Sequence, residues 1–350
     1  MDAVDDLKPG RGEPVVGEGA PTFGTLDPMT ARSTVVDWLL DADPSIRWQV
    51  MRDLLGLPPS DWQPERARVE TEGWGGMLLS FQDDDGRWAS GAHFPADYVW
   101  GGDEAGQPWT STSHSLSQLR EFGLDPTTSR AGRMVELIGA NCRWEHANQP
   151  YWEGEVEPCI NGTAVANGVY FGVDMTSVVN RLLGERLEDG GWNCETENGS
   201  TRSSFDTTIN VLEGLLEYET ATGGTAESRE ARRSGEEYLL KRSLFRRLST
   251  GEPADDRYLY FLHPNRWHFD VLRALDYFRA ASLLTGEPPD PRLTEAIDHV
   301  RSRRLEDGTW PLDWSPTGRT WFEVDDGEGE PSRWVTLRAM RVLDWWDAAR

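Results

Sequence analysis

Apolar residues recur along this chain at the three- and four-residue spacing of an amphipathic helix. The clearest stripe comprises Phe205, Ile209, Leu212 and Leu216. Similar stripes lie at residues 134–138, 179–187, 271–278 and 334–343. Alternating apolar and polar runs, which would indicate strands, are scarce. The pattern predicts an all-α protein of about a dozen helices, joined as roughly six helical hairpins.

The first helices are expected soon after an irregular N-terminal segment. Residues 1–28 are rich in glycine, proline and acidic side chains, and we interpret them as a disordered leader before a single domain of residues 29–350. A second helix is expected to begin at Pro44, because Asp43 can cap its free amide groups and proline suits the first helical position. Gly56 is expected to close that helix.

A short motif, Asp-Gly-x-Trp, occurs three times and ends at Trp88, Trp192 and Trp310. Each copy follows an amphipathic helix, and each precedes a polar loop and a Ser/Thr-rich start of another apolar helix. The copies are 104 and 118 residues apart, which suits two hairpins per interval. We expect the glycine to end the helix in a left-handed conformation and the indole to fold back over the helix end.

The first copy, Gly-Gly-Met-Leu-Leu-Ser-Phe-Gln-Asp-Asp-Asp-Gly-Arg-Trp at residues 75–88, resembles the QW motif of squalene–hopene cyclases and related terpene cyclases. The copies at 188–192 and 306–310 resemble the shorter form shared with protein prenyltransferase β subunits. The resemblance extends from about residue 30 to the C-terminus. It implies an (α/α)6 toroid with a mostly apolar central cavity.

The catalytic signature of these families is only partly present. Class II terpene cyclases protonate their substrate with an Asp-x-Asp-Asp motif, and the nearest match here is Glu323-Val324-Asp325-Asp326. Clustered carboxylates can raise one pKa, so Glu323, Asp325 and Asp326 are candidate catalytic acids. The alternative is a solvated acidic loop. The chain also has length for one helical domain, whereas bacterial triterpene cyclases carry two.

The charge and the apolar runs exclude several classes of protein. A formal net charge of −25 argues against nucleic-acid binding, which needs clustered basic side chains. No apolar run approaches the roughly 20 residues of a membrane span, and the N-terminus lacks a signal peptide, so we expect a cytoplasmic protein. Three cysteines cannot form a full disulfide framework.

A closed ring of hairpins would bring the starts of its inner helices to one rim. Four residues near those starts and in the adjoining loops have the chemistry of a zinc shell: Cys159, Cys194, Asp206 and His268. Prenyltransferases hold a zinc ion with Asp, Cys and His, which supports zinc as the candidate cofactor. In the alternative interpretation, the cysteines are small core residues and His268 packs beside Trp267.

Two arginine–aromatic pairs, Arg266-Trp267 and Arg333-Trp334, are also expected at this rim, with His114 at another inner-helix start. They are candidate substrate-binding residues, because arginine can hold an anionic head such as a diphosphate while aromatic rings line the cavity. The alternative places each arginine on the surface and each tryptophan in the core.

Three functions remain open from the sequence. The first is a terpene cyclase-like or prenyltransferase-like toroid that binds or transforms an apolar, isoprenoid-like small molecule. The second is a non-catalytic toroid that binds a peptide or protein at its acidic rim. The third is a zinc-dependent enzyme of unrelated chemistry. A solvent-filled, aromatic cavity with acidic side chains would favour the first function, and a centre filled by the protein's own side chains would favour the second.

Overall fold

The computed structural model describes residues 28–349, so the predicted leader of residues 1–28 lies outside the described residues except for its last position. The helices are α1 (Pro28–Leu40), α2 (Pro44–Asp53), α3 (Pro59–Ala67), α4 (Gly73–Ser80), α5 (Thr112–Phe122), α6 (Ser129–Asn141), α7 (Pro158–Tyr170), α8 (Thr176–Gly184), α9 (Phe205–Thr222), α10 (Ala226–Leu240), α11 (Val271–Thr285), α12 (Thr294–Ser302) and α13 (Arg333–Ala348). Within residues 28–349, β-structure is limited to isolated β-bridges. The predicted all-α class is confirmed.

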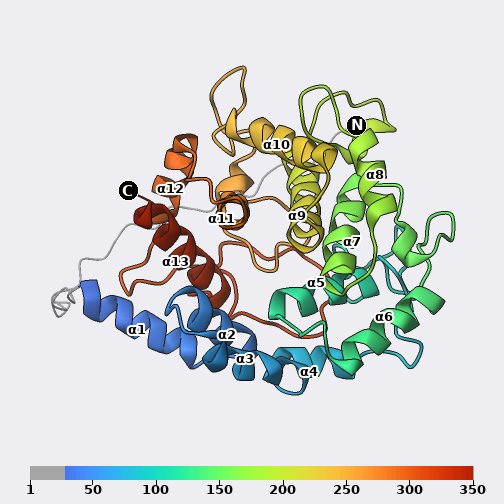
Figure 1. Cartoon of the computed structure of the whole chain (residues 1–350), viewed down its shortest axis with the longest axis horizontal. Helices are drawn as coiled ribbons and strands as arrows, with labels where there is room; N and C mark the ends of the chain where they lie inside the picture. Colours follow the sequence, from blue (N-terminus) through green and yellow to red (C-terminus); the bar gives the residue numbers. More distant parts are fainter. Residues whose placement is uncertain (1–27, 350) are drawn as a thin grey trace.

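Six helices contact one another in a closed cycle. In order, α2 contacts α5, which contacts α7, then α9, α11 and α13, and α13 returns to α2. The helices α1, α4, α8, α10 and α12 contact this cycle, and Figure 1 shows them towards the outside of the molecule. This is the contact pattern that a ring of helix pairs requires.

The start of α2 follows from its sequence. Asp43 caps the helix, since its carboxylate accepts a hydrogen bond from the Ser45 amide at 2.8 Å, and Pro44 is the first helical residue. The other oxygen of Asp43 accepts the Trp74 amide at 2.8 Å and so ties α4 to the same point. The helix ends at Asp53, and Gly56, with a φ of 61°, lies in the turn beyond it.

The three motif tryptophans occupy equivalent positions, as predicted. All three are buried, and each indole N–H donates to a carbonyl ten residues earlier, in the last turn of the preceding outer helix. The pairs are Trp88–Leu78 at 2.9 Å, Trp192–Leu182 at 2.7 Å and Trp310–Val300 at 2.7 Å. Carbonyls at the end of a helix lack intrahelical partners, and the indole supplies one.

The same tryptophans also contact the following inner helix. The peptide N–H of each donates to a threonine hydroxyl in the first turns of α5, α9 or α13. The threonines are Thr112 at 3.1 Å, Thr208 at 3.1 Å and Thr336 at 2.9 Å. Each motif therefore joins the end of an outer helix to the start of an inner one.

The motif glycines have a different role from the one predicted. Gly86, Gly190 and Gly308 have φ values of 92°, 107° and 91°, in the region that favours glycine. However, the helices before them end at residues 80, 184 and 302 with right-handed caps. The glycines thus form the tight turn that returns the chain to the tryptophan, and they do not end the helices.

Candidate functional site

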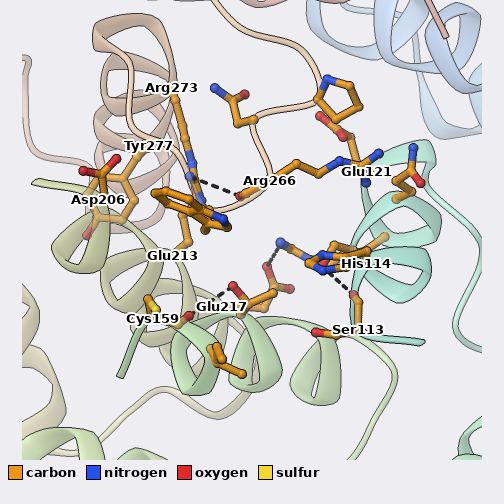
Figure 2. Close-up of a pocket in the computed structure, with 18 of the residues that line it drawn as sticks. Ser113, His114, Glu121, Cys159, Asp206, Glu213, Glu217, Arg266, Arg273 and Tyr277 are labelled. Carbon is orange, nitrogen blue, oxygen red and sulfur yellow. Dashed lines mark hydrogen bonds and ion pairs between the residues drawn. The ribbon is translucent and has the colours of Figure 1, made fainter. Parts of the chain in front are cut away.

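A cavity of about 940 Å³ lies inside the cycle of inner helices. Its wall includes eight arginines and seven carboxylates, together with aromatic side chains such as Trp48, Trp267 and Trp334. The resemblance to terpene cyclases implies a mostly apolar wall, and this wall combines a larger apolar surface with these charged groups. Eight of the chain's 33 arginines therefore line this one cavity. The close-up in Figure 2 shows part of this wall.

Most of the charged groups on the wall form ion pairs. Arg273 on α11 pairs with Glu213 on α9 at 2.7 Å, and Arg338 on α13 pairs with Glu121 on α5. Burial would raise the pKa of Glu213, but the guanidinium of Arg273 outweighs burial and lowers it. The first pair connects neighbouring inner helices, and the second joins α13 to α5, which lie on either side of α2 in the cycle. Both neutralise charges whose isolated burial would be costly.

Glu157, Cys159 and Cys194 come together on the cavity wall. Glu157 directly precedes α7, Cys159 lies in its first turn, and Cys194 begins the short 3₁₀ turn Cys194–Thr196 after the second motif. The two sulfurs are 2.6 Å apart, and Cys159 Sγ lies 3.5 Å from Glu157 Oε2. Contact with Cys194, together with burial, raises the pKa of the Cys159 thiol well above its usual value.

This trio has the composition of a three-ligand zinc site. One potential ligand atom from each residue lies within 4.8 Å of the others. Tetrahedral zinc with bonds of about 2.3 Å to sulfur would hold two sulfurs roughly 3.8 Å apart. The sulfurs would therefore separate by about 1 Å on binding, while the spacing of Glu157 and Cys159 already fits.

Two of the four predicted metal ligands, Asp206 and His268, lie outside this trio. Asp206 does not join the trio, because its two oxygens accept hydrogen bonds from the Phe269 amide at 2.8 Å and the Tyr258 hydroxyl at 3.1 Å. Burial raises the pKa of Asp206. His268 also lies outside the trio, with its ring centroid 3.6 Å from that of Trp267. His268 therefore packs beside Trp267, as the alternative interpretation of the sequence proposed.

Glu157 was missed by the sequence analysis. It lies two residues before Cys159 and next to the proline that begins α7, in an acidic stretch that reads as an ordinary helix start. Only the position of Cys194 opposite this helix start makes Glu157 part of a ligand group.

The predicted substrate-binding residues separate into two groups. Arg266, Trp267, His114 and Trp334 line the cavity. Arg333 does not, because it donates to the Asp41 carbonyl at 3.0 Å and its guanidinium lies 4.9 Å from the centre of the Trp38 ring. Arg333 therefore connects α13 to the outer α1 helix.

Two neutral histidines flank a glutamine at the cavity wall. Gln107 Nε2 lies 2.9 Å from His93 Nε2 and 3.3 Å from His114 Nε2, while its oxygen accepts the Trp267 indole N–H at 3.3 Å. This arrangement makes both Nε2 atoms acceptors. Burial lowers the pKa of His93 to about 4 and that of His114 well below its usual value. Both rings are therefore uncharged at neutral pH.

The predicted acidic residues lie away from the cavity wall. Glu323 and Asp326 are exposed, and Asp325 is half-buried just before α13, where it accepts a hydrogen bond from the Ser332 hydroxyl at 3.0 Å. Burial raises the pKa of Asp325 to about 7. A carboxyl group with a raised pKa therefore exists in this segment, but none of the three residues lines the cavity.

Among the described residues, no helix combines the length and the apolar run that a membrane span requires. Comparison of the chain with models of protein families finds no match, and comparison with curated proteins finds no similar sequence.

Proposed function

We propose that this protein is a metal-dependent enzyme that acts on a small polar molecule inside its ring of helices. Glu157, Cys159 and Cys194 are the proposed zinc ligands. The observation that carries the proposal is the convergence of these three side chains, from two separate segments, on the wall of a large cavity. Three protein ligands leave a fourth coordination position for water or substrate, which is the arrangement of catalytic zinc sites.

The chain's own residues supply the remaining requirements. A bound zinc ion would lower the pKa of a coordinated water and polarise a substrate oxygen. The thiols of Cys159 and Cys194 must lose their protons to bind the metal, so zinc binding depends on pH. The paired charges of the wall, such as Arg273 with Glu213, provide fixed dipoles that orient a polar substrate.

This proposal has more support than the two alternatives. An isoprenoid chain would have to lie beside the eight arginines and seven carboxylates of the wall, and Asp325 is not placed to protonate it in the cavity. A toroid that only binds proteins at its rim needs no open centre, whereas this centre encloses about 940 Å³. Both observations favour a small polar ligand inside the ring.

The test is metal analysis of the purified protein with matched cysteine variants. We expect about one zinc per chain after dialysis, as in structural and catalytic zinc sites. Cys159→Ser and Cys194→Ser should each lower zinc occupancy at least tenfold. Cys142→Ala is the control, because Cys142 is buried and lies outside the trio. The zinc occupancy of this variant should match that of the wild type.

Thiol counting by mass spectrometry distinguishes the opposing result. A Cys159–Cys194 disulfide in the freshly purified protein, without bound metal, would overturn the zinc proposal. Equal zinc loss in the Cys142→Ala variant would also contradict it, because the metal would then depend on the fold in general.

A further inference from the structure

Arg266 differs from the other arginines on the cavity wall. All eight lie in the described part of the chain. Six donate a hydrogen bond to an oxygen, and a seventh, Arg279, forms an ion pair with Asp53 at 3.7 Å. Arg338 and Arg273, for example, pair with carboxylates, while Arg66 donates to the Gly123 carbonyl at 2.8 Å. The guanidinium of Arg266 has no such oxygen partner among the described residues. It forms a cation–π contact with Trp109, with its central carbon 5.3 Å from the centre of the ring.

Hydrogen bonds fix the main chain of Arg266, and one aromatic ring lies under its guanidinium. Its carbonyl accepts from Arg273 at 3.4 Å, and Arg273 also donates to the His268 carbonyl at 2.8 Å. Trp109, which stacks under the guanidinium, is itself buried and donates to the Pro316 carbonyl at 3.1 Å. The main chain of Arg266 and the ring beneath its guanidinium are therefore both fixed without a ligand.

The backbone of Arg266 is strained. Its φ of 54° lies in the left-handed region, which residues other than glycine, asparagine and aspartate rarely adopt. Strain of this kind is concentrated at ligand-binding and catalytic sites, where the surrounding structure maintains it. Figure 2 shows the side chain reaching across the cavity from the loop before α11 towards the side where Glu121 lies.

Among the described residues, no carboxylate forms an ion pair with Arg266. Glu121 and Glu323 act on it only through space, Glu121 already pairs with Arg338, and His93 and His114 are neutral. Burial lowers the pKa of Arg266 only to about 10, so it remains a cation at neutral pH. A partly buried guanidinium without an acceptor is less favourable than a paired one, and an anion that enters the cavity would supply the missing partner.

We infer that Arg266 is the anchor for an oxyanion group, a carboxylate or a phosphate, on the small molecule that the cavity receives. This inference rests on the proposed function, because it names the chemical class of the proposed substrate. The planar guanidinium can form two parallel hydrogen bonds to such a group. The zinc ligands lie on other elements, α7 and the turn after the second motif, so the two sites can be tested separately.

The experiment measures anion binding by the intact chain with pyrophosphate and with malonate as separate probes. Calorimetric titration and thermal shift are recorded for the wild type, Arg266→Met, Arg266→Lys and Arg333→Met. We expect at least one probe to bind the wild type, with affinity reduced at least tenfold in Arg266→Met and partly retained in Arg266→Lys. Arg333→Met is the matched control, since Arg333 faces α1, and it should bind like the wild type.

Without ligand, Arg266→Met should melt at the wild-type temperature or above it, because the substitution removes a partly buried charge that has no ion-pair partner. A structural role for the cation predicts a lower melting temperature instead. The inference is overturned if neither probe binds the wild type, if both bind Arg266→Met equally well, or if Arg266→Met is destabilised without ligand. Pyrophosphate binding alone would indicate a phosphate-bearing ligand, and malonate binding alone a carboxylate.

The failure of one proposal can be distinguished from the failure of the other. Cys194→Ser should abolish zinc binding but leave the Arg266-dependent anion affinity within about twofold. If the cysteine variants keep their zinc content while anion binding follows Arg266, the metal assignment fails and the anion site stands. If zinc is bound but Arg266→Met has no effect, the converse holds.

Discussion

Individual side chains in this protein owe their properties to burial more than to their neighbours in sequence. Asp325 and Asp326 are adjacent, yet Asp326 is exposed while Asp325 is half-buried at the start of α13. Burial raises the pKa of Asp325 to about 7 from a usual value of 3.8, despite the hydrogen bond from Ser332. The carboxyl of Asp325 therefore prefers its proton in the folded state.

This preference predicts a pH-dependent stability that Asp325→Asn removes. Between about pH 4 and pH 7 the folded chain holds a proton on Asp325 that the unfolded chain has lost, so this residue lowers the free energy of unfolding as pH rises. Urea denaturation of Asp325→Asn should therefore show stability that improves relative to wild type by up to about 1.4 kcal/mol per pH unit across that range.

Asp326→Asn is the control for that measurement, because it makes the same change one residue away, at an exposed position. Its stability difference from the wild type should change with pH much less than that of Asp325→Asn, because Asp326 is only a minor contributor to the raised pKa of Asp325. A pH-independent difference for Asp325→Asn would contradict the raised pKa.

At the scale of elements, the three Asp-Gly-x-Trp motifs act as repeated connectors between an outer and an inner helix. The indole of each tryptophan closes the end of one helix, and its peptide N–H contacts a threonine at the start of the next. Thr208 of α9 is fully buried and accepts the Trp192 amide. The connection thus depends on a single hydroxyl in each repeat.

Thr208→Val, which has nearly the same shape, should leave the Trp192 amide without its acceptor. We expect it to lower the free energy of unfolding by about 1–3 kcal/mol, the usual cost of an unsatisfied buried polar group. Chemical denaturation measures this difference. Thr220→Val, the same change at an exposed position of the same helix, should alter stability by no more than about 0.5 kcal/mol. Equal effects of the two variants would show that the connector is not specific.

At the scale of the whole molecule, the ring closes where α13 returns to α2 and α11 (Figure 1). Arg341 of α13 joins all three helices, since it pairs with Asp276 at 2.8 Å and contacts Gln49 at 3.1 Å and Asp53 at 3.2 Å. Burial would raise the pKa of Asp276, but Arg341 outweighs it and lowers that pKa. The closure is therefore partly electrostatic and buried.

Arg341→Met should destabilise this closure strongly, because it leaves Asp276 and Asp53 with only Arg279 and Arg52 as partners. Breaking a buried ion pair from one side costs about 3–5 kcal/mol, which thermal or chemical unfolding would detect. Arg32→Met is the comparison, since its pair with Asp344 also links distant segments but is about 40% exposed. That variant should lose no more than about 1 kcal/mol, and a loss equal to that of Arg341→Met would refute the closure argument.

The sequence by itself determined the helices and their repeat. The apolar stripe on α9, the cap at Asp43 and the equivalent positions of Trp88, Trp192 and Trp310 follow from interactions within about ten residues or from helical periodicity, and all were predictable. It also indicated that Cys159 and Cys194 would approach each other, because the repeat placed both near one rim.

Only the tertiary structure decided which neighbouring side chains face the cavity. Successive residues of a helix point about 100° apart, so Trp334 lines the cavity while Arg333 turns towards α1. The rotation of each helix about its axis is set by packing between helices, which no local pattern records. For the same reason Glu157, and not Asp206, completes the ligand trio, and Arg266 is the arginine left without an acceptor.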